Sequence, residues 1–359
     1  MRILNFDDAV SYFLLENGAG RNIPSASLST VIIMHTQTAL KNSIDVHNLL
    51  TEGLDQTMLA AERGKAIARI VPEIVEHARH VLSHVTDQSE LDALRASAKC
   101  HPITEYLNQC PLTVHSAQQP RGYPGDAELI DYLYHHTDRT ADIARATAIG
   151  RQILQTNLDR PAPIAVRARR QIVADLISHI AAKTPSARIL SVACGHAREL
   201  ELVDHALLER IATFLAFDQD AKSLEVATRY RTKPGIPRIA PQCGTIMDLL
   251  KDTQLDDFEL VYSSGLYDYL SDRLCQRLTQ NLFERLKPGG TLLLANFLPE
   301  TPDIGYMEIF MNWSLRYRSK QQIHDFAATI NENLISDIEY FTDSHQNIGF
   351  LKIVKGVMY

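Results

Sequence analysis

The stretch ILSVACGHARELE, residues 189 to 201, limits the folds open to this chain more than any other. A short apolar run from Ile189 to Val192 ends in a turn of small residues from Ala193 to Ala197. The segment from Arg198 to Leu208 then has the pattern of a helix. A strand, a tight turn and a helix in this order form the nucleotide pocket of doubly wound α/β proteins. The sequence therefore predicts an α/β fold with a nucleotide site at this turn.

The composition of the turn indicates which nucleotide it would hold. A turn that binds a pyrophosphate normally contains three glycines, whereas here only Gly195 is present and Ala193 and Ala197 take the outer positions. The next apolar run ends at Asp218 and Gln219, where a carboxylate would accept hydrogen bonds from ribose hydroxyls. This pattern favours an adenosine ligand without phosphates, of which S-adenosylmethionine is the common example.

Two later segments supply further parts of such a pocket. In GTIMDLL, Ile246 and Met247 are predicted to sandwich the adenine, and either Asp248 or the Thr245 hydroxyl would meet its amino group. The sequence does not decide between these two polar groups.

A strand predicted from Phe258 to Ser263 ends in a group of polar residues. Ligands bind at the carboxyl ends of parallel strands. We therefore expect Ser263 and Ser264 to line the cosubstrate, and Tyr267 and Asp268 to take part in the reaction.

The C-terminal part completes the predicted sheet. A helix and a Pro-Gly-Gly turn lead into a strand from Thr291 to Phe297, and two apolar runs, Leu334 to Tyr340 and Ile348 to Val354, form a hairpin-like pair. This half, roughly residues 165 to 359, resembles the class I S-adenosylmethionine-dependent methyltransferases. The resemblance implies a Rossmann-like, seven-stranded sheet that is parallel except for a last antiparallel strand, with S-adenosylmethionine as cosubstrate.

The composition restricts the partners of this chain. Its 359 residues carry a formal net charge of −7, whereas proteins that bind a nucleic-acid backbone cluster Lys and Arg. The first residues lack the features of a signal peptide, and no apolar run is long enough to span a membrane. Five scattered cysteines fit reduced thiols. We therefore expect a cytoplasmic protein with a small-molecule substrate and no nucleic-acid partner, and the sequence leaves a homodimer open.

The first 95 residues show helical periodicity, with a break near Pro24 and residues 25 to 29. The clearest helix runs from Ile67 to Leu82, and a second covers Thr86 to Ser97. Three histidines of this region are spaced three and four apart: His77, His80 and His84. A solvated polar flank explains them better than a metal site, because no further ligand group accompanies them. No metal is expected.

The segment PRGYPGD, Pro120 to Asp126, is too rich in proline and glycine for a helix. It displays Arg121, Tyr123 and Asp126 on a fixed loop that leads into a helix from about Ala127. A structural Ω-type loop and a lid over the strand ends both fit this pattern. The predicted organisation is a helical lid or substrate domain (1–140), a connector (141–164) and the catalytic domain (165–359).

A narrower resemblance covers most of the chain beyond Cys100. The loop segment, AVRARRQIVADLI (residues 165 to 177), the ACGHARE turn and YMEIFMNWSLRYRS (residues 306 to 319) look like a subfamily with an N-terminal helical domain. Its members methylate the carboxylate of 3-hydroxy fatty acids to give a quorum-signalling ester. Cyclases that convert S-adenosylmethionine into azetidine-2-carboxylate are similar in architecture.

The roles of three sets of side chains each allow two interpretations. Arg167, Arg169 and Arg170 form a solvated cluster more readily than a carboxylate site, although Arg binds carboxylates well. Arg198 either binds the methionine carboxylate or is an exposed helix residue. The stripe in a helix around Trp313 is core rather than an acceptor wall; it comprises Met307, Phe310, Met311, Trp313 and Tyr317.

The residues and the resemblance together favour methyl transfer to a small acceptor, the carboxylate of a (hydroxy)acyl compound. Tyr123 and Tyr267 are candidates to hold the sulfonium cation, and Asp126, Asp268 or Tyr267 to accept a proton. One alternative is cyclisation of S-adenosylmethionine with release of methylthioadenosine. The other is a nucleoside-binding regulatory protein without turnover.

Overall fold

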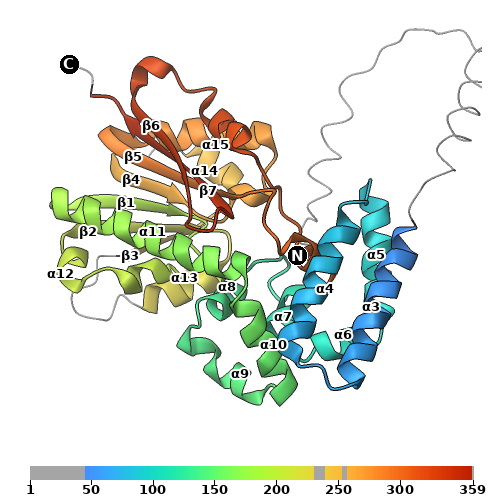
Figure 1. The fold of residues 1–359 in the computed structure, drawn as a ribbon. Helices are drawn as coiled ribbons and strands as arrows, with labels where there is room; N and C mark the ends of the chain where they lie inside the picture. Colours follow the sequence, from blue (N-terminus) through green and yellow to red (C-terminus); the bar gives the residue numbers. More distant parts are fainter. Residues whose placement is uncertain (1–44, 230–238, 253–256, 358–359) are drawn as a thin grey trace, which may run out of the picture. The chain divides into compact units, whose positions relative to one another are not determined.

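The computed structural model describes residues 45–229, 239–252 and 257–357 (Figure 1). Val46–Tyr359 form one compact unit. The break expected near Pro24 lies outside the described residues.

Within the described residues, seven strands form one sheet in the order β3-β2-β1-β4-β5-β7-β6. The strands are β1 (Ala187–Val192), β2 (Ile211–Asp218), β3 (Ile239–Cys243), β4 (Phe258–Ser263), β5 (Leu286–Phe297), β6 (Ile335–Thr342) and β7 (Ile348–Lys355). The first five pair in parallel, and β7 lies antiparallel between β5 and β6. The predicted fold class, a Rossmann-like class I methyltransferase sheet with an N-terminal helical region, is confirmed.

Among the described helices that precede α11 (Pro161–Lys183), the three longest are α3 (Val46–Glu62), α4 (Ile67–Leu82) and α5 (Gln88–Cys100). The shorter ones are α6 (Ile103–Leu107), α7 (Pro111–Gln118), α8 (Ala127–Leu133), α9 (Thr140–Arg145) and α10 (Ala148–Leu158), with the 3₁₀ helix η1 (Thr137–Arg139) before α9. The two predicted helices of this region correspond to α4 and α5. Asp87 begins α5, because its side chain accepts a hydrogen bond from the Glu90 N–H.

Most of the remaining helices lie on the two faces of the sheet (Figure 1), whereas α16 (Ile304–Ile309) packs against α4 and α5. The remaining helices are α11 (Pro161–Lys183), α12 (His205–Leu208), α13 (Ala221–Thr228), α14 (Ile246–Lys251), α15 (Asp272–Glu284), α16 and α17 (Lys320–His324), with the 3₁₀ helices η2 (Arg198–Leu202), η4 (Tyr267–Tyr269), η5 (Asp325–Ala327) and η6 (Glu332–Leu334). Residues of α11 and α13 belong to the core on one face, and residues of α14, α15 and α17 to the core on the other.

Strand residues alternate between these two cores. Ile189 and Leu260 belong to the first core, whereas their neighbours Leu190 and Val261 belong to the second. The first core also contains the buried face of α4. The helical region and one face of the sheet are therefore parts of a single hydrophobic core.

One close contact in this region joins segments far apart in the sequence. Gly305 in α16 lies against the backbone of α4, and a Cβ atom at Gly305 would come within 2.3 Å of the carbonyl carbon of Ala78. Only glycine allows the two backbones to approach so closely.

Three local predictions were wrong. The helix expected from Arg198 to Leu208 is split into η2 and α12, because Val203 is extended and the Asp204 side chain caps the second piece. The helix expected around Trp313 ends at Ile309 in α16. Asn312 then adopts a left-handed conformation with φ of 49°, which asparagine tolerates and which breaks a helix.

The third concerns the Lys-Pro-Gly-Gly segment, which was expected to be a turn before β5. It lies inside β5, where Phe258 pairs with Leu286 but Leu260 pairs with Thr291, so the extra residues form a bulge.

Candidate functional site

The turn after β1 and the end of β2 are held together by the Asp218 carboxylate. The Gly195 N–H donates to Oδ2 at 2.8 Å and the Asp220 N–H donates to Oδ1 at 2.9 Å. Asp218 is 6% exposed, and this burial raises the pKa of its carboxyl group. Ala193, Gly195 and Ala197 all have positive φ, between 50° and 54°. The predicted ligand turn is thus sharply bent, and its carboxylate is oriented before any ligand binds.

The loop Pro120 to Asp126 lies beside this carboxylate. Arg121 forms an ion pair with Asp220 at 3.0 Å and another with Glu128. Tyr123 is half-buried, and burial raises the pKa of its hydroxyl, as do the Asp218, Asp220 and Asp126 carboxylates. The structure therefore places the loop that carries Tyr123 against Asp220, two residues beyond Asp218.

The backbone of this loop also packs directly on aromatic side chains. Gly125 has a φ of +71°, and a Cβ there would lie 2.4 Å from the Tyr269 hydroxyl and 2.9 Å from Trp313. The Tyr269 hydroxyl donates to the Pro124 carbonyl and accepts from the Trp313 indole N–H at 2.8 Å. The loop is therefore fitted to the carboxyl end of β4 rather than standing free.

We predict that Gly125→Ala will lower the free energy of unfolding by about 2 kcal/mol more than Gly122→Ala does. Gly122 is the matched control, because its φ is +85° but no atom lies within 4 Å of a Cβ there. Urea unfolding of both variants measures the difference. Equal losses would show that the contact of the loop with Tyr269 and Trp313 is loose.

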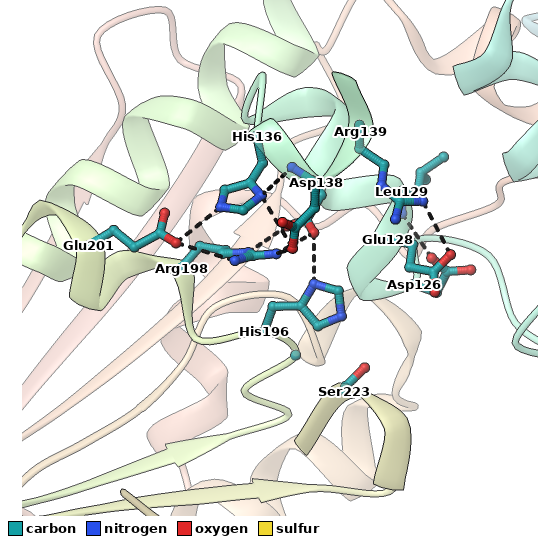
Figure 2. Close-up of polar contacts among 12 residues, drawn as sticks. Asp126, Glu128, Leu129, His136, Asp138, Arg139, His196, Arg198, Glu201 and Ser223 are labelled. Atoms are coloured by element: carbon teal, nitrogen blue, oxygen red, sulfur yellow. Dashed lines mark hydrogen bonds and ion pairs between the residues drawn. The ribbon is translucent and has the colours of Figure 1, made fainter. Parts of the chain in front are cut away.

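The Asp126 side chain is occupied by local contacts. It is 1% exposed and accepts from the Leu129 N–H at 2.8 Å as the N-cap of α8 (Figure 2). It also pairs with His115 Nε2 at 2.9 Å. Its role in proton transfer remains a proposal, and its capping role explains why the helix begins at Ala127.

An ionic network with a buried centre and exposed outer residues joins the glycine turn to α8 (Figure 2). We call it the Asp131 cluster, and it comprises Asp131, His136, Asp138, His196, Arg198 and Glu201. Asp131 accepts from Arg198 Nε at 2.8 Å and Nη2 at 2.7 Å, and lies 2.8 Å from His196 Nδ1. Burial opposes ionisation of Asp131, but the bonds from His196 and Arg198 outweigh it and lower its pKa to about 2.

This cluster changes the interpretation of Arg198. The residue is 5% exposed, so the expectation of an exposed helix residue was wrong. Its nitrogens already have protein partners in Asp131, Asp138 and Glu201. Binding of the methionine carboxylate by Arg198 stays a proposal. No local pattern around Arg198 indicates its partner Asp131, which lies on another helix.

Asp131, His136 and Asp138 each offer a possible metal-ligand atom within 4.8 Å of the others. Arg198 Nη2, however, lies 2.7 Å from Asp131 and 2.5 Å from Asp138. The guanidinium therefore already supplies positive charge between the two carboxylates.

Of the three spaced histidines, His77 pairs with the Leu49 carbonyl at 2.9 Å.

The residues expected at the adenine lie at the start of α14. Thr245 and Asp248 form a capping box, in which the Asp248 carboxylate accepts from the Thr245 N–H at 2.9 Å and hydroxyl at 2.7 Å. These hydrogen bonds lower the pKa of Asp248. Ile246 is half-buried and Met247 is 47% exposed. The two polar candidates bind each other, and the choice between them stays open.

At the end of β4 the predicted residues point in different directions. Ser263 is buried and donates to the Val192 carbonyl at 3.0 Å, whereas Ser264 is half-buried. Tyr267 is fully buried, and its hydroxyl pairs with Thr279 of α15 at 2.9 Å. The structure does not bring the Tyr267 hydroxyl to the glycine turn, because the ring packs into the second core.

Asp268 is a buried carboxyl group at the same strand end. It accepts from the Phe297 N–H at 2.7 Å, and burial raises its pKa to about 7, opposed by this bond and by Arg169 and Arg318. Asp268 is therefore able to exchange a proton near neutral pH.

Gln219, which was predicted to bind the cosubstrate, is exposed beyond the end of β2.

The three arginines of α11 are not a solvated cluster, contrary to the sequence reading. Arg167 donates to the Leu133 and Leu158 carbonyls, and Arg170 to the Arg198 carbonyl and Glu201. Arg169 is 6% exposed. Neighbouring elements α8, α10 and η2 contact α11 and enclose these side chains.

An apolar cavity of about 30 Å³ lies between α11, α16 and the end of β5. Its walls include Val166, Phe297, Met307, Met311 and Trp313. Part of the predicted aromatic and methionine stripe therefore lines a cavity, while Phe310 packs in the first core.

In the part of the chain that the structure describes, no helix combines the length and the apolar character needed to cross a membrane.

Part of the chain is similar in sequence to a known protein family, and the fold is similar to that of solved structures. Residues 189–290 match a family model described as a methyltransferase domain. No curated protein matches the chain. A solved structure, a possible exported protein from Bordetella parapertussis, is similar at 18% identity with a TM-score of 0.55, over 77% of this chain and 99% of that one. At this identity the likeness is one of fold.

Two solved methyltransferases bound to S-adenosylhomocysteine are also similar. N-methyltransferase NodS from Bradyrhizobium japonicum WM9 has 14% identity and a TM-score of 0.39, over 55% of this chain and 89% of that one. Magnesium protoporphyrin IX methyltransferase from Synechocystis PCC 6803 has 13% identity and a TM-score of 0.40, over 63% and 97%. Residues 189–290 are thus similar in sequence to a methyltransferase domain, and the sheet order agrees with the fold expected for one.

Proposed function

We propose that the protein is an S-adenosylmethionine-dependent methyltransferase whose acceptor is a small molecule, the carboxylate of a (hydroxy)acyl compound. The observation that carries this proposal is the Asp218 carboxylate, held by the Gly195 and Asp220 N–H groups at the carboxyl end of β2. A carboxylate in this position suits the two ribose hydroxyls of an adenosine. The match of residues 189–290 to a methyltransferase domain supports the same ligand.

The surrounding residues have defined roles in this proposal. The bound cosubstrate supplies an electrophilic methyl group on a sulfonium. Asp218 binds the ribose and Ile246 and Met247 contact the adenine, with Ser263 and Ser264 at the neighbouring strand end. Tyr123, on the loop that pairs with Asp220, offers a ring face to the cation. The helical region before α11 covers the strand ends and keeps water from the reacting atoms.

Methyl transfer to a carboxylate needs little acid or base catalysis from the protein. The carboxylate is already ionised at neutral pH, so the protein contributes mainly by positioning it in line with the methyl group. The apolar cavity beside Phe297 and Trp313 has a volume of only about 30 Å³, so an acyl chain would need the surrounding side chains to move apart. The preference for an acyl acceptor rests on the resemblance to the subfamily that methylates 3-hydroxy fatty acids.

Asp268 favours a second candidate function, the cyclisation of S-adenosylmethionine to azetidine-2-carboxylate. In that reaction the methionine amine attacks its own γ-carbon and methylthioadenosine leaves, so the ammonium proton must first be removed. A buried carboxyl with a pKa of about 7 is able to accept that proton near neutral pH.

One incubation tests both candidates. The protein is incubated with S-adenosylmethionine alone, and then with fatty acids and 3-hydroxy fatty acids of increasing chain length. We expect S-adenosylhomocysteine and a methyl ester only when an acid is present. Methylthioadenosine formed without an acid would establish the cyclase instead. Binding without either product would indicate a regulatory protein, and absence of binding would overturn the cosubstrate assignment.

A further inference from the structure

Arg169 of α11 is a buried cation without a matching anion. It is 6% exposed, and its Nε atom is buried without a hydrogen-bond partner. No carboxylate in residues 45–229, 239–252 and 257–357 forms an ion pair with it. Its neighbours Arg167 and Arg170 differ, because both donate to main-chain carbonyls. Arg169 is therefore held inside the protein with its Nε donor unused.

The guanidinium lies at the segment that leaves β4. Its Nη1 and Nη2 atoms are 3.6 and 3.7 Å from the position that a Cβ would take at Gly265. The Tyr134 hydroxyl lies beside the guanidinium. The positive charge of Arg169 also opposes the rise that burial causes in the pKa of Asp268 and of Tyr269. Since ligands bind at the carboxyl ends of parallel strands, Arg169 lies where a ligand would reach it.

The nearby acids do not neutralise this cation fully. Burial raises the pKa of Asp268 to about 7, so part of it is uncharged at neutral pH. Glu199 accepts from the Tyr262 hydroxyl, and burial raises its pKa as well. A buried arginine without an ion-pair partner is costly for folding. A function that needs the positive charge explains its position better than a structural role.

We propose that Arg169 is the receptor for a ligand carboxylate at the carboxyl end of β4. The planar guanidinium binds a carboxylate through two parallel hydrogen bonds. The proposal rests on the proposed function, because that function supplies two carboxylates, one on the methionine part of the cosubstrate and one on the acceptor. Val166 lies three residues before Arg169 in α11 and lines the apolar cavity, so the same helix side offers an apolar wall and a cation.

The test uses Arg169→Met, with Arg169→Lys as the conservative variant. Lys99→Met is the control, because Lys99 is exposed and its loss changes the net charge equally. In the first arm, calorimetry measures the binding of S-adenosylhomocysteine and of methylthioadenosine, which lacks the amino-acid part. If Arg169 binds the methionine carboxylate, Arg169→Met will weaken S-adenosylhomocysteine about 10- to 100-fold and leave methylthioadenosine unchanged.

The second arm tests the acceptor. Octanoate and octanamide are titrated into protein saturated with S-adenosylhomocysteine. If Arg169 binds the acceptor, the wild type will bind octanoate but not octanamide, and Arg169→Met will lose octanoate while keeping S-adenosylhomocysteine. Arg169→Lys should restore part of the lost binding in either arm, since it keeps the charge but not the two parallel bonds.

The outcomes separate this proposal from the proposed function. If Arg169→Met binds S-adenosylhomocysteine like the wild type, and octanoate binding is absent or unchanged, the carboxylate receptor is overturned while the cosubstrate site stands. If the wild type binds neither nucleoside, the proposed function fails and this inference falls with it. Thermal unfolding of the ligand-free variant adds a readout of folding. We expect a melting temperature equal to or a few degrees above that of the wild type, because a buried unpaired charge is gone.

Discussion

Asp218→Ala will weaken the binding of S-adenosylhomocysteine by roughly 100-fold, or about 3 kcal/mol. The carboxylate accepts from the Gly195 and Asp220 N–H groups, so its removal leaves both donors unsatisfied and frees the turn. It also removes the proposed acceptor for the ribose hydroxyls. Both losses act on the same ligand, which is why we expect the largest effect on binding here.

Calorimetry with the purified variant measures this loss. Asp337→Ala is the matched control, because Asp337 is exposed on β6 and its replacement removes one carboxylate from the same chain. Methylthioadenosine should lose affinity as strongly as S-adenosylhomocysteine, because both carry the ribose. A variant that binds either nucleoside with wild-type affinity would disprove the assignment of this carboxylate.

Asp131→Ala will have the largest effect on folding, with an expected loss of about 3 to 5 kcal/mol in the free energy of unfolding. Asp131 is 1% exposed and binds both Arg198 and His196, which are themselves buried. Without it, these two residues keep their polar groups but lose their main acceptor. Since both belong to the turn that carries Gly195, nucleoside binding should fall as well.

Urea unfolding of Asp131→Ala and Asp131→Asn tests this prediction, with Asp337→Ala as control. Arg198→Met added to Asp131→Ala should recover part of the lost stability, because it removes the unpaired cation. A double variant less stable than Asp131→Ala would show that the cost lies in packing and not in charge.

The same carboxylate makes the fold sensitive to acid. Its pKa is about 2 in the folded protein, against an ordinary value of 3.8. A depressed pKa gives stability that is present above the ordinary value and is lost as the pH falls through the folded value. The stability difference between the wild type and Asp131→Asn should therefore shrink between about pH 4 and pH 2.

The fold could be predicted from the sequence because its signals are local. The apolar run before Gly195 became β1, and the run ending at Asp218 became β2. The two last apolar runs became β6 and β7, with bounds within a few residues of those expected. In each case burial on one or both faces imposes a pattern that a short window of sequence reveals.

The site was predicted only in part, because its polar contacts join distant segments. No sequence pattern near Arg198 indicates that it pairs with Asp131. Likewise, the lack of an ion-pair partner for Arg169 follows from the three-dimensional packing of α11 and cannot be seen in the sequence. The capping box of Thr245 and Asp248, in contrast, has a local signature, a threonine followed three residues later by an acid. We nevertheless expected one of these two side chains to meet the adenine, whereas in the structure they bind each other.

The contact between Gly305 and the backbone of α4 bears on how this protein can be shortened. A clone that starts at α11 would omit α4, and the surface that Gly305 and the first core present to it would face water. Such a fragment would keep every strand of the sheet and yet expose an apolar area that favours aggregation. We therefore expect the part of the chain from α11 onward to need the preceding helices in order to stay soluble.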